Sequence, residues 1–139
     1  MRLIGLDYGS KTCGVSISDE TQLIATGVET IRYKEKNELF TKLDLIFNEY
    51  DIEKIILGNP INLDGSISKR SEETFIFKEE LIKRYNKEVI LVDERLTSVI
   101  VNNMLIMNNT RRDNRKKVVD KLAASLILQS YLDRSRNGK

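Results

Sequence analysis

The sequence contains no histidine. This absence excludes the Ser-His and Cys-His pairs that activate many hydrolytic nucleophiles, and it excludes histidine as a general acid or base. Zinc sites built from His and Cys are excluded as well, because the chain has a single cysteine. Hydrolytic chemistry must therefore rest on carboxylates, Lys, Tyr or hydroxyl groups. Carboxylates that hold a hard, oxygen-preferring metal ion are the leading option.

Disulfides and long apolar runs are absent too. Cys13 has no second cysteine to pair with, which fits a reducing compartment. No run approaches 18 apolar residues, and the first residues enter a strand pattern without the layout of a signal peptide. We therefore expect a cytoplasmic protein without a membrane partner. The length and the ordinary balance of apolar and charged residues predict one domain, residues 1–139.

Positive charge is concentrated toward the end of the chain. Residues 111–139 hold nine Lys or Arg and three Asp, a net charge of +6, whereas the first 110 residues carry −4. Cations at a helix start oppose the helix dipole, so this segment does not serve helix stability. A solvated loop is the plain alternative. We expect contact with nucleic-acid phosphates, made by Arg111, Arg112, Arg115, Lys116 and Lys117.

Hydrophobic periodicity predicts an α/β fold. Short connections favour an antiparallel meander of three strands, over Leu3–Leu6, Gly14–Ser18 and Leu23–Ile31. Two further strands follow, at Lys54–Gly58 and Glu88–Val92. Four helices are predicted: the first at about Asn37–Tyr50, the second at about Ser68–Arg84, the third beginning at Thr97 or Ser98, and the fourth at Arg115–Arg134. The order predicts a five-stranded mixed sheet, a meander plus parallel strands, with helices on both faces.

Polar residues follow three of the predicted strands. Asp7 follows the first strand, Asn59 the fourth and Glu94 the fifth. If these strands are parallel, the three residues share the rim at which open α/β sheets bind ligands. Each has a plainer alternative, because Asp7 suits a turn and Glu94 suits a solvated strand end.

Asp120 stands at the edge of the apolar stripe of the last predicted helix. The small residues Ala123 and Ala124 would let this helix approach the sheet closely. A carboxylate buried there needs a compensating charge, which a metal ion or a neighbouring Lys116 or Lys117 could supply. Three acids from distant segments, without histidine, favour Mg²⁺ or Mn²⁺ and phosphodiester cleavage.

Five segments, in this order, resemble the bacterial YqgF family. They are Ile4-Gly-Leu-Asp-Tyr-Gly-Ser-Lys, Gly14-Val-Ser-Ile-Ser-Asp, Gly58-Asn-Pro-Ile-Asn-Leu-Asp-Gly, Asp93-Glu-Arg-Leu-Thr and Val119-Asp-Lys-Leu-Ala-Ala. The family is described both as pre-16S ribosomal RNA nucleases and as Holliday junction resolvases with an RNase H-like fold. The resemblance runs from Leu3 to about Leu132. It implies that Asp7, Glu94 and Asp120 are the catalytic, metal-binding acids.

The same resemblance implies substrate contacts around these acids. The loop Gly58–Gly65 matches the family's rim loop, which makes Asn59 and Asn62 candidate substrate contacts, although a plain turn explains them equally well. Apart from the resemblance, the nuclease hypothesis makes Lys11 or Arg95 a candidate for holding the phosphate. Thr12 and Cys13 depart from the basic or aliphatic pair of many relatives, but this departure leaves the three acids intact.

We therefore expect a metal-dependent nuclease of structured nucleic acid, acting in 5′-end maturation of pre-16S rRNA. Two alternatives stay open: a Holliday junction resolvase, which needs a two-fold dimer to make symmetric cuts in branched DNA, and a non-catalytic module that binds rRNA or a ribosome precursor. The sequence leaves monomer or homodimer open. Gly5–Ser10 also resembles the phosphate loop of sugar kinases and actin-like ATPases, but those use two related domains and this chain has one such loop.

Overall fold

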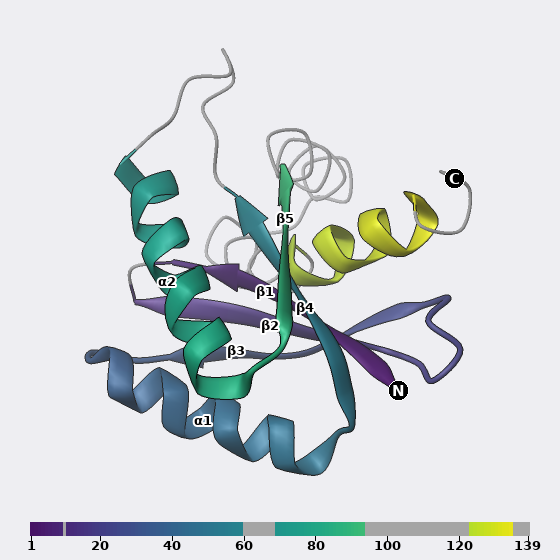
Figure 1. Ribbon diagram of the computed structural model, residues 1–139, viewed down its shortest axis with the longest axis horizontal. Helices are drawn as coiled ribbons and strands as arrows, with labels where there is room; N and C mark the ends of the chain where they lie inside the picture. Colours follow the sequence, from purple (N-terminus) through teal and green to yellow (C-terminus); the bar gives the residue numbers. More distant parts are fainter. Residues whose placement is uncertain (10, 60–68, 94–122, 135–139) are drawn as a thin grey trace, which may run out of the picture.

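The computed structural model describes residues 1–9, 11–59, 69–93 and 123–134. Five strands form one mixed sheet in the order β3-β2-β1-β4-β5 (Figure 1). They are β1 (Arg2–Tyr8), β2 (Thr12–Ser18), β3 (Ala25–Arg32), β4 (Ile52–Asn59) and β5 (Glu88–Asp93). The first three strands pair antiparallel, whereas β4 lies parallel to β1 and β5 parallel to β4. The predicted sheet is confirmed.

Helices cover both faces of this sheet, as predicted. On one face lie α1 (Lys36–Glu49) and α2 (Lys69–Tyr85). Residues 123–134, here called the C-terminal helix segment, lie on the other face (Figure 1). Successive side chains of β1 point to opposite faces of the sheet and so contribute to both cores. Ile4 and Leu6 join the core beneath α1 and α2, whereas Leu3 packs with Ile127 and Leu128. No helix within the described ranges is long and apolar enough to cross a membrane.

The two helices of the larger layer are held together by polar contacts as well as by their apolar stripes. Lys36 Nζ lies 2.6 Å from Glu80 Oε1, and Asp44 accepts two hydrogen bonds from Arg84, at 2.9 and 2.6 Å. Tyr85 Oη donates a third bond to Asp44, at 2.7 Å. These pairs are partly exposed, so they contribute little stability individually and serve mainly to set the mutual alignment of α1 and α2.

The turn between β2 and β3 is built around Asp19. Its Oδ1 accepts hydrogen bonds from the backbone N–H of Leu23 at 2.8 Å and of Ile24 at 3.0 Å, and its Oδ2 accepts one from Thr21 Oγ1. These bonds lower the pKa of Asp19 to about 2. Strand β3 therefore begins at Ala25, two residues later than predicted, because the carboxylate holds Leu23 and Ile24 in the turn.

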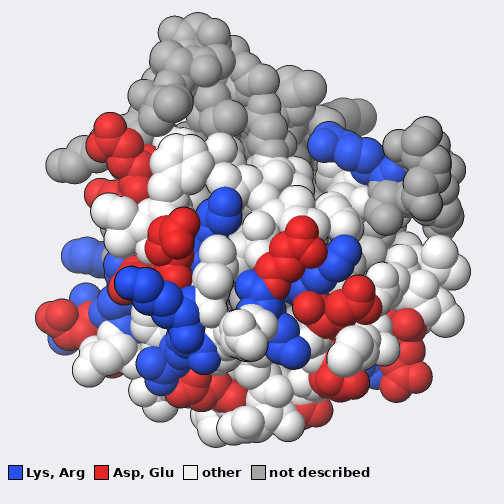
Figure 2. Space-filling model, viewed as in Figure 1, with Lys and Arg blue, Asp and Glu red and all other residues white. Residues whose placement is uncertain are grey.

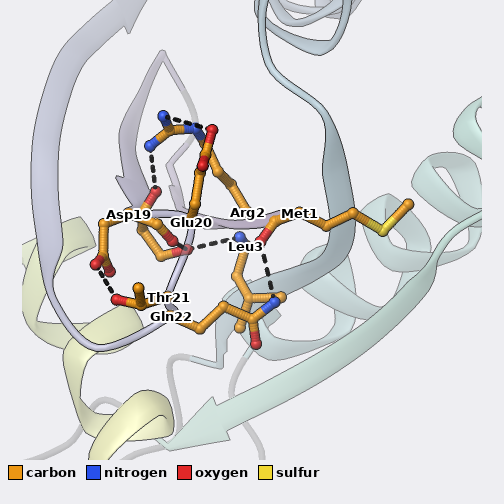
Figure 3. A network of polar contacts seen from close by, with 8 residues as sticks. Met1, Arg2, Leu3, Asp19, Glu20, Thr21 and Gln22 are labelled. Carbon is orange, nitrogen blue, oxygen red and sulfur yellow. Dashed lines mark hydrogen bonds and ion pairs between the residues drawn. The ribbon is translucent and has the colours of Figure 1, made fainter.

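The same turn is fastened to the beginning of the chain (Figure 3). Arg2 donates to the carbonyl of Ser18 at 3.1 Å, and Gln22 Nε2 donates to the carbonyl of Met1 at 3.1 Å. Gln22 has a φ of 59°, the left-handed conformation that closes the turn. These bonds hold the β2–β3 turn against the start of β1, at the end of the sheet opposite the carboxyl ends of β1, β4 and β5.

Candidate functional site

The carboxyl ends of the three parallel strands meet at one rim of the sheet. Leu6 of β1 pairs with Leu57 of β4, and Asn59 of β4 pairs with Asp93 of β5. Asp7 follows Leu6 in β1, so Asp7, Asn59 and the end of β5 lie at the same level. The parallel arrangement that the rim prediction required is confirmed.

The side chains of Asp7 and Asn59 leave the sheet on opposite faces. Strand alternation puts Asp7 on the same side as Leu3, which packs against the C-terminal helix segment. Asn59 shares its side with Leu57, beneath α2, and its Oδ1 accepts a 2.6 Å hydrogen bond from Ser71 Oγ of α2. Asn59 is 9% exposed, and this bond joins the end of β4 to the first turn of α2.

The C-terminal helix segment lies unusually close to β1 on the Asp7 side. A Cβ built on Gly5 would lie 2.7 Å from Cβ of Leu128 and 3.1 Å from the carbonyl oxygen of Ala124, so only glycine fits there without a shift. Ser16 of β2 donates a 2.8 Å hydrogen bond to the same Ala124 carbonyl. The predicted close approach of this helix to the sheet is therefore present at Ala124, and β1 and β2 both take part in it.

The backbone turns sharply between β1 and β2. Gly9 N–H donates to the carbonyl of Thr12 at 2.7 Å, which closes the turn, and Lys11 between them is exposed. We call Gly9, Lys11 and Thr12 the β1–β2 corner. Lys11 thus stands next to the end of β1 that carries Asp7, where a phosphate contact was predicted. That role stays a prediction.

Aromatic rings support this corner from the side of α1 and α2. Tyr8 stacks on Phe77 of α2 with ring centroids 4.0 Å apart, and Tyr33 stacks on Tyr8 with ring centroids 6.5 Å apart. Lys36 Nζ lies 5.9 Å from the centroid of the Tyr8 ring. Partial burial opposes the charge of Lys36, but its hydrogen bond to Glu80, with a contribution from Tyr8, outweighs this and raises the pKa.

Two buried groups nearby stay protonated at neutral pH. Burial raises the pKa of the Cys13 thiol, and the neighbouring Asp7 charge adds to the shift, so Cys13 packs as a small apolar residue, as predicted. Burial also raises the pKa of the Tyr33 phenol, with further contributions from Tyr8 and Cys13. The Tyr33 hydroxyl is therefore a hydrogen-bond donor throughout the physiological pH range.

Most of the predicted site residues lie outside the described residues. These are Glu94, Asp120, Asn62, Arg95, Arg111, Arg112, Arg115, Lys116 and Lys117. Within the described ranges, no three His, Cys, Asp or Glu side chains are grouped so that they could hold a metal ion. The described surface in Figure 2 interleaves both signs of charge, so this face offers no patch of one sign for a polyanion. The metal set and the basic contacts stay predictions.

Sequence reasoning missed the residues that make the close approach possible. Gly5 lies in an apolar strand run, and a glycine inside a strand is a known signal for close backbone contact. Ser16 gave no comparable signal, because its partner Ala124 is 108 residues away in the sequence. Tyr33 was not singled out either.

Comparison with solved structures defines the class of fold as RNase H-like. RuvC of Thermus thermophilus in complex with a Holliday junction substrate superimposes with a TM-score of 0.59 and 12% identity, covering 99% of this chain and 97% of that chain. The fowlpox virus Holliday junction resolvase gives a TM-score of 0.55 and 16% identity, covering 96% of this chain and 99% of that one. At these identities the likeness concerns the fold alone.

Sequence comparison then identifies the family. The RuvX family model, described as Holliday junction resolvase, matches residues 1–134. A Bacillus subtilis (strain 168) protein named "Putative pre-16S rRNA nuclease" is 44% identical over 135 residues, covering 96% of this chain and 98% of the relative. A Caldanaerobacter subterraneus protein of the same name is 44% identical over 138 residues, 99% of each chain. The chain belongs to this family, as the five sequence segments predicted.

Proposed function

We propose that this chain is a nuclease that hydrolyses phosphodiester bonds of structured nucleic acid with the help of divalent metal ions. The observation that carries the proposal is the close packing of the C-terminal helix segment on β1 at Gly5, on the side of the sheet that Asp7 faces. This packing supports a convergence of acids from both ends of the chain. The family's name for its members agrees with that chemistry.

Chain connectivity limits how far Asp120 can lie from Asp7. Asp120 precedes Ala124 by four residues, so their Cα atoms are at most about 14 Å apart. Asp7 follows Gly5 by two residues, a rise of about 7 Å along β1. Since Ala124 lies close to Gly5, this connectivity supports the proposal that Asp120 and Asp7 share one site. Asp120 is our proposed second ligand.

Glu94, which follows β5, is our proposed third ligand. It follows Asp93, which pairs with Asn59 at the rim. Val92 packs on the side of the C-terminal helix segment, and alternation along a strand predicts the same side for Glu94, two residues later. Asp7, Glu94 and Asp120 would therefore offer carboxylate oxygens from three segments, the donor type that Mg²⁺ and Mn²⁺ prefer.

The remaining polar residues would bind and orient the substrate. When bound, a divalent ion supplies Lewis-acid charge at the scissile phosphate. The chain's own carboxylates fix where that charge sits, and Lys11 on the exposed β1–β2 corner holds a neighbouring phosphate. Arg95 and the basic residues between 111 and 117 extend the contact along the backbone of the nucleic acid.

The favoured substrate is the 5′ extension of pre-16S rRNA, because curated relatives that are 44% identical over nearly the whole chain are named for it. This role would place the chain in the cytoplasm, beside ribosome precursors. A four-way DNA junction is the second candidate, since the family model is described as a Holliday junction resolvase. Symmetric cleavage of a junction would require a two-fold dimer.

A direct test compares cleavage of three labelled substrates: an RNA with the extended 5′ end of 16S rRNA, a four-way DNA junction and a plain DNA duplex. We expect cleavage of the RNA with Mg²⁺ or Mn²⁺ and none with EDTA. Asp7→Asn should abolish cleavage, whereas Asp51→Asn, an exposed carboxylate before β4, should preserve it.

Three results would change this assignment. Junction cleavage by a dimer, with the RNA left intact, would favour the second candidate. Tight RNA binding without cleavage in any metal would favour a binding module. Cleavage that survives in Asp7→Asn would contradict the proposed acid site.

A further inference from the structure

Tyr33 bonds the β1–β2 corner at two points. Its backbone N–H donates to the carbonyl of Lys11 at 2.9 Å, and its hydroxyl donates to the carbonyl of Gly9. Tyr33 follows the last residue of β3, so the third strand reaches past its partner β2 to hold the turn between the first two. The corner thus depends on a residue more than twenty positions away.

Sheet pairing secures Asp7 without help from Tyr33. Asp7 pairs with Gly14 of β2, and its neighbour Leu6 also pairs with Leu57 of β4. In the corner that follows, one backbone bond joins the described residues Gly9 and Thr12. The two bonds from Tyr33 therefore act mainly on the corner and on Lys11, whose own carbonyl accepts one of them.

The Tyr33 ring has little freedom to move. It is 7% exposed, it stacks on Tyr8 at an interplanar angle of 8°, and Tyr8 stacks in turn on Phe77 of α2. A phenol held in this way keeps its hydroxyl at the Gly9 carbonyl, with the Tyr8 side chain as a further hydrogen-bond partner, whereas a loosely packed tyrosine would share its hydroxyl with water. The stack of Tyr33, Tyr8 and Phe77 thereby links the corner to α2.

We infer that Tyr33 is a positioning residue for phosphate recognition: its hydroxyl fixes the corner so that Lys11 meets the phosphate backbone of the substrate. The inference rests on the proposed nuclease function and extends it to a residue outside the acid site. The inference assigns phosphate binding to the β1–β2 corner and catalysis to the acids. Loss of the Tyr33 hydroxyl should weaken nucleic-acid binding and raise KM, while kcat and the metal requirement stay as they are.

The test uses Tyr33→Phe, with Tyr85→Phe as the matched control. Tyr85 also loses a hydroxyl hydrogen bond, to Asp44 at 2.7 Å, but between α1 and α2. For the RNA substrate we expect Kd and KM to rise about three- to tenfold in Tyr33→Phe, the weight of one hydrogen bond, with unchanged kcat. Tyr85→Phe should leave both constants at the native values.

Coupling to Lys11 distinguishes positioning from a general loss of stability. If Tyr33 acts through Lys11, then Tyr33→Phe should add less than twofold to the loss of affinity in Lys11→Ala. Combined with Lys42→Ala, an exposed lysine of α1, it should keep its full effect. Full additivity with Lys11→Ala would overturn the inference.

Hydrogen exchange gives a readout that does not depend on nuclease activity. The amide protons of Gly9 and Tyr33 close the corner, and both should exchange faster in Tyr33→Phe, with no change in Tyr85→Phe. Unchanged exchange, or unchanged affinity in an active protein, would overturn the inference alone. A native chain that neither binds nor cleaves nucleic acid would instead overturn the proposed function, and the inference with it.

Discussion

Ser16 donates a 2.8 Å hydrogen bond to the carbonyl of Ala124, across 108 residues of sequence. This contact joins the middle of β2 to the C-terminal helix segment directly above Gly5 of β1. The Ser16 hydrogen bond and the lack of a side chain at Gly5 thus allow the C-terminal helix segment to pack closely against β1. The proposed site depends on this junction, because Asp7 follows on one side of it and Asp120 precedes it on the other.

Enlarging Gly5 should separate the two elements. In Gly5→Ala the new Cβ would approach Cβ of Leu128 to 2.7 Å, so the helix segment must shift. We expect the free energy of unfolding to fall by about 1–3 kcal/mol, as in other overpacked cores, and cleavage to fall with it at temperatures where the variant is folded. Urea unfolding and a cleavage assay check both.

Ser16→Ala tests the other contact of this junction, the hydrogen bond to the Ala124 carbonyl. It removes a buried donor from the Ala124 carbonyl and should cost about 1–2 kcal/mol. Native cleavage by folded Gly5→Ala would show that the close approach does not set the site.

The contact between Asn59 and Ser71 should contribute to stability. Asn59→Ala and Ser71→Ala each leave a buried partner without its 2.6 Å hydrogen bond, so each should lower the free energy of unfolding by about 1–3 kcal/mol. The double variant should lose less than the sum of the two. Additive losses would mean that the two side chains act separately. A larger loss of RNA affinity in Asn59→Ala than in Ser71→Ala would support the predicted substrate contact.

Acid should weaken the turn between β2 and β3 as Asp19 becomes protonated. The pKa of Asp19 is about 2 in the folded chain, below its ordinary value of 3.8. The carboxylate therefore stabilises the fold above pH 4, and this contribution disappears as the pH falls from about 4 to 2. The difference in urea midpoint between the native chain and Asp19→Ala should be largest near pH 7 and vanish near pH 2.

Glu49→Ala, an exposed carboxylate of α1, serves as the control for that series. A constant difference between the native chain and Asp19→Ala at every pH would contradict the ionic role of the turn. The hydrogen bonds from Leu23 and Ile24 would then depend on side-chain shape instead of charge.

Removing the basic residues should weaken nucleic-acid binding and its dependence on salt. We expect the variant with alanine at Arg111, Arg112, Lys116 and Lys117 to bind RNA more weakly at low salt. Its slope of log K against log salt should be shallower by about 3, since each phosphate contact contributes roughly 0.7–0.9. The control replaces Lys42, Lys78, Lys83 and Lys87, which changes the net charge equally. An unchanged slope would exclude the segment as a phosphate contact.

The sequence predicts the architecture well where local periodicity decides it. The apolar runs place all five strands, and the i, i+3, i+4 stripe from Leu39 to Tyr50 places α1. The start of β3 was placed at Leu23, too early, because apolar character alone does not reveal that Asp19 bonds the next two backbone amides.

The candidate site was predictable only in part. The carboxyl rim follows from parallel strand order, so the neighbourhood of Asp7 and Asn59 could be inferred. Their opposite faces could not, because the registers of β1 and β4 were unknown before the structure. Contacts between distant segments, such as Gly5 with Leu128 and Tyr33 with Gly9, leave no periodic trace in the sequence.

The most direct test measures cleavage of the extended 16S RNA by Asp7→Asn, Glu94→Gln, Asp120→Asn and the double variant Asp7→Asn/Asp120→Asn. Residues that act as one metal site show non-additive losses. We predict that each single variant loses at least about a hundredfold in kcat, and that the double variant loses little more than either of its parents. Native cleavage by Asp120→Asn, or multiplying losses in the double variant, would contradict a shared site of Asp7 and Asp120.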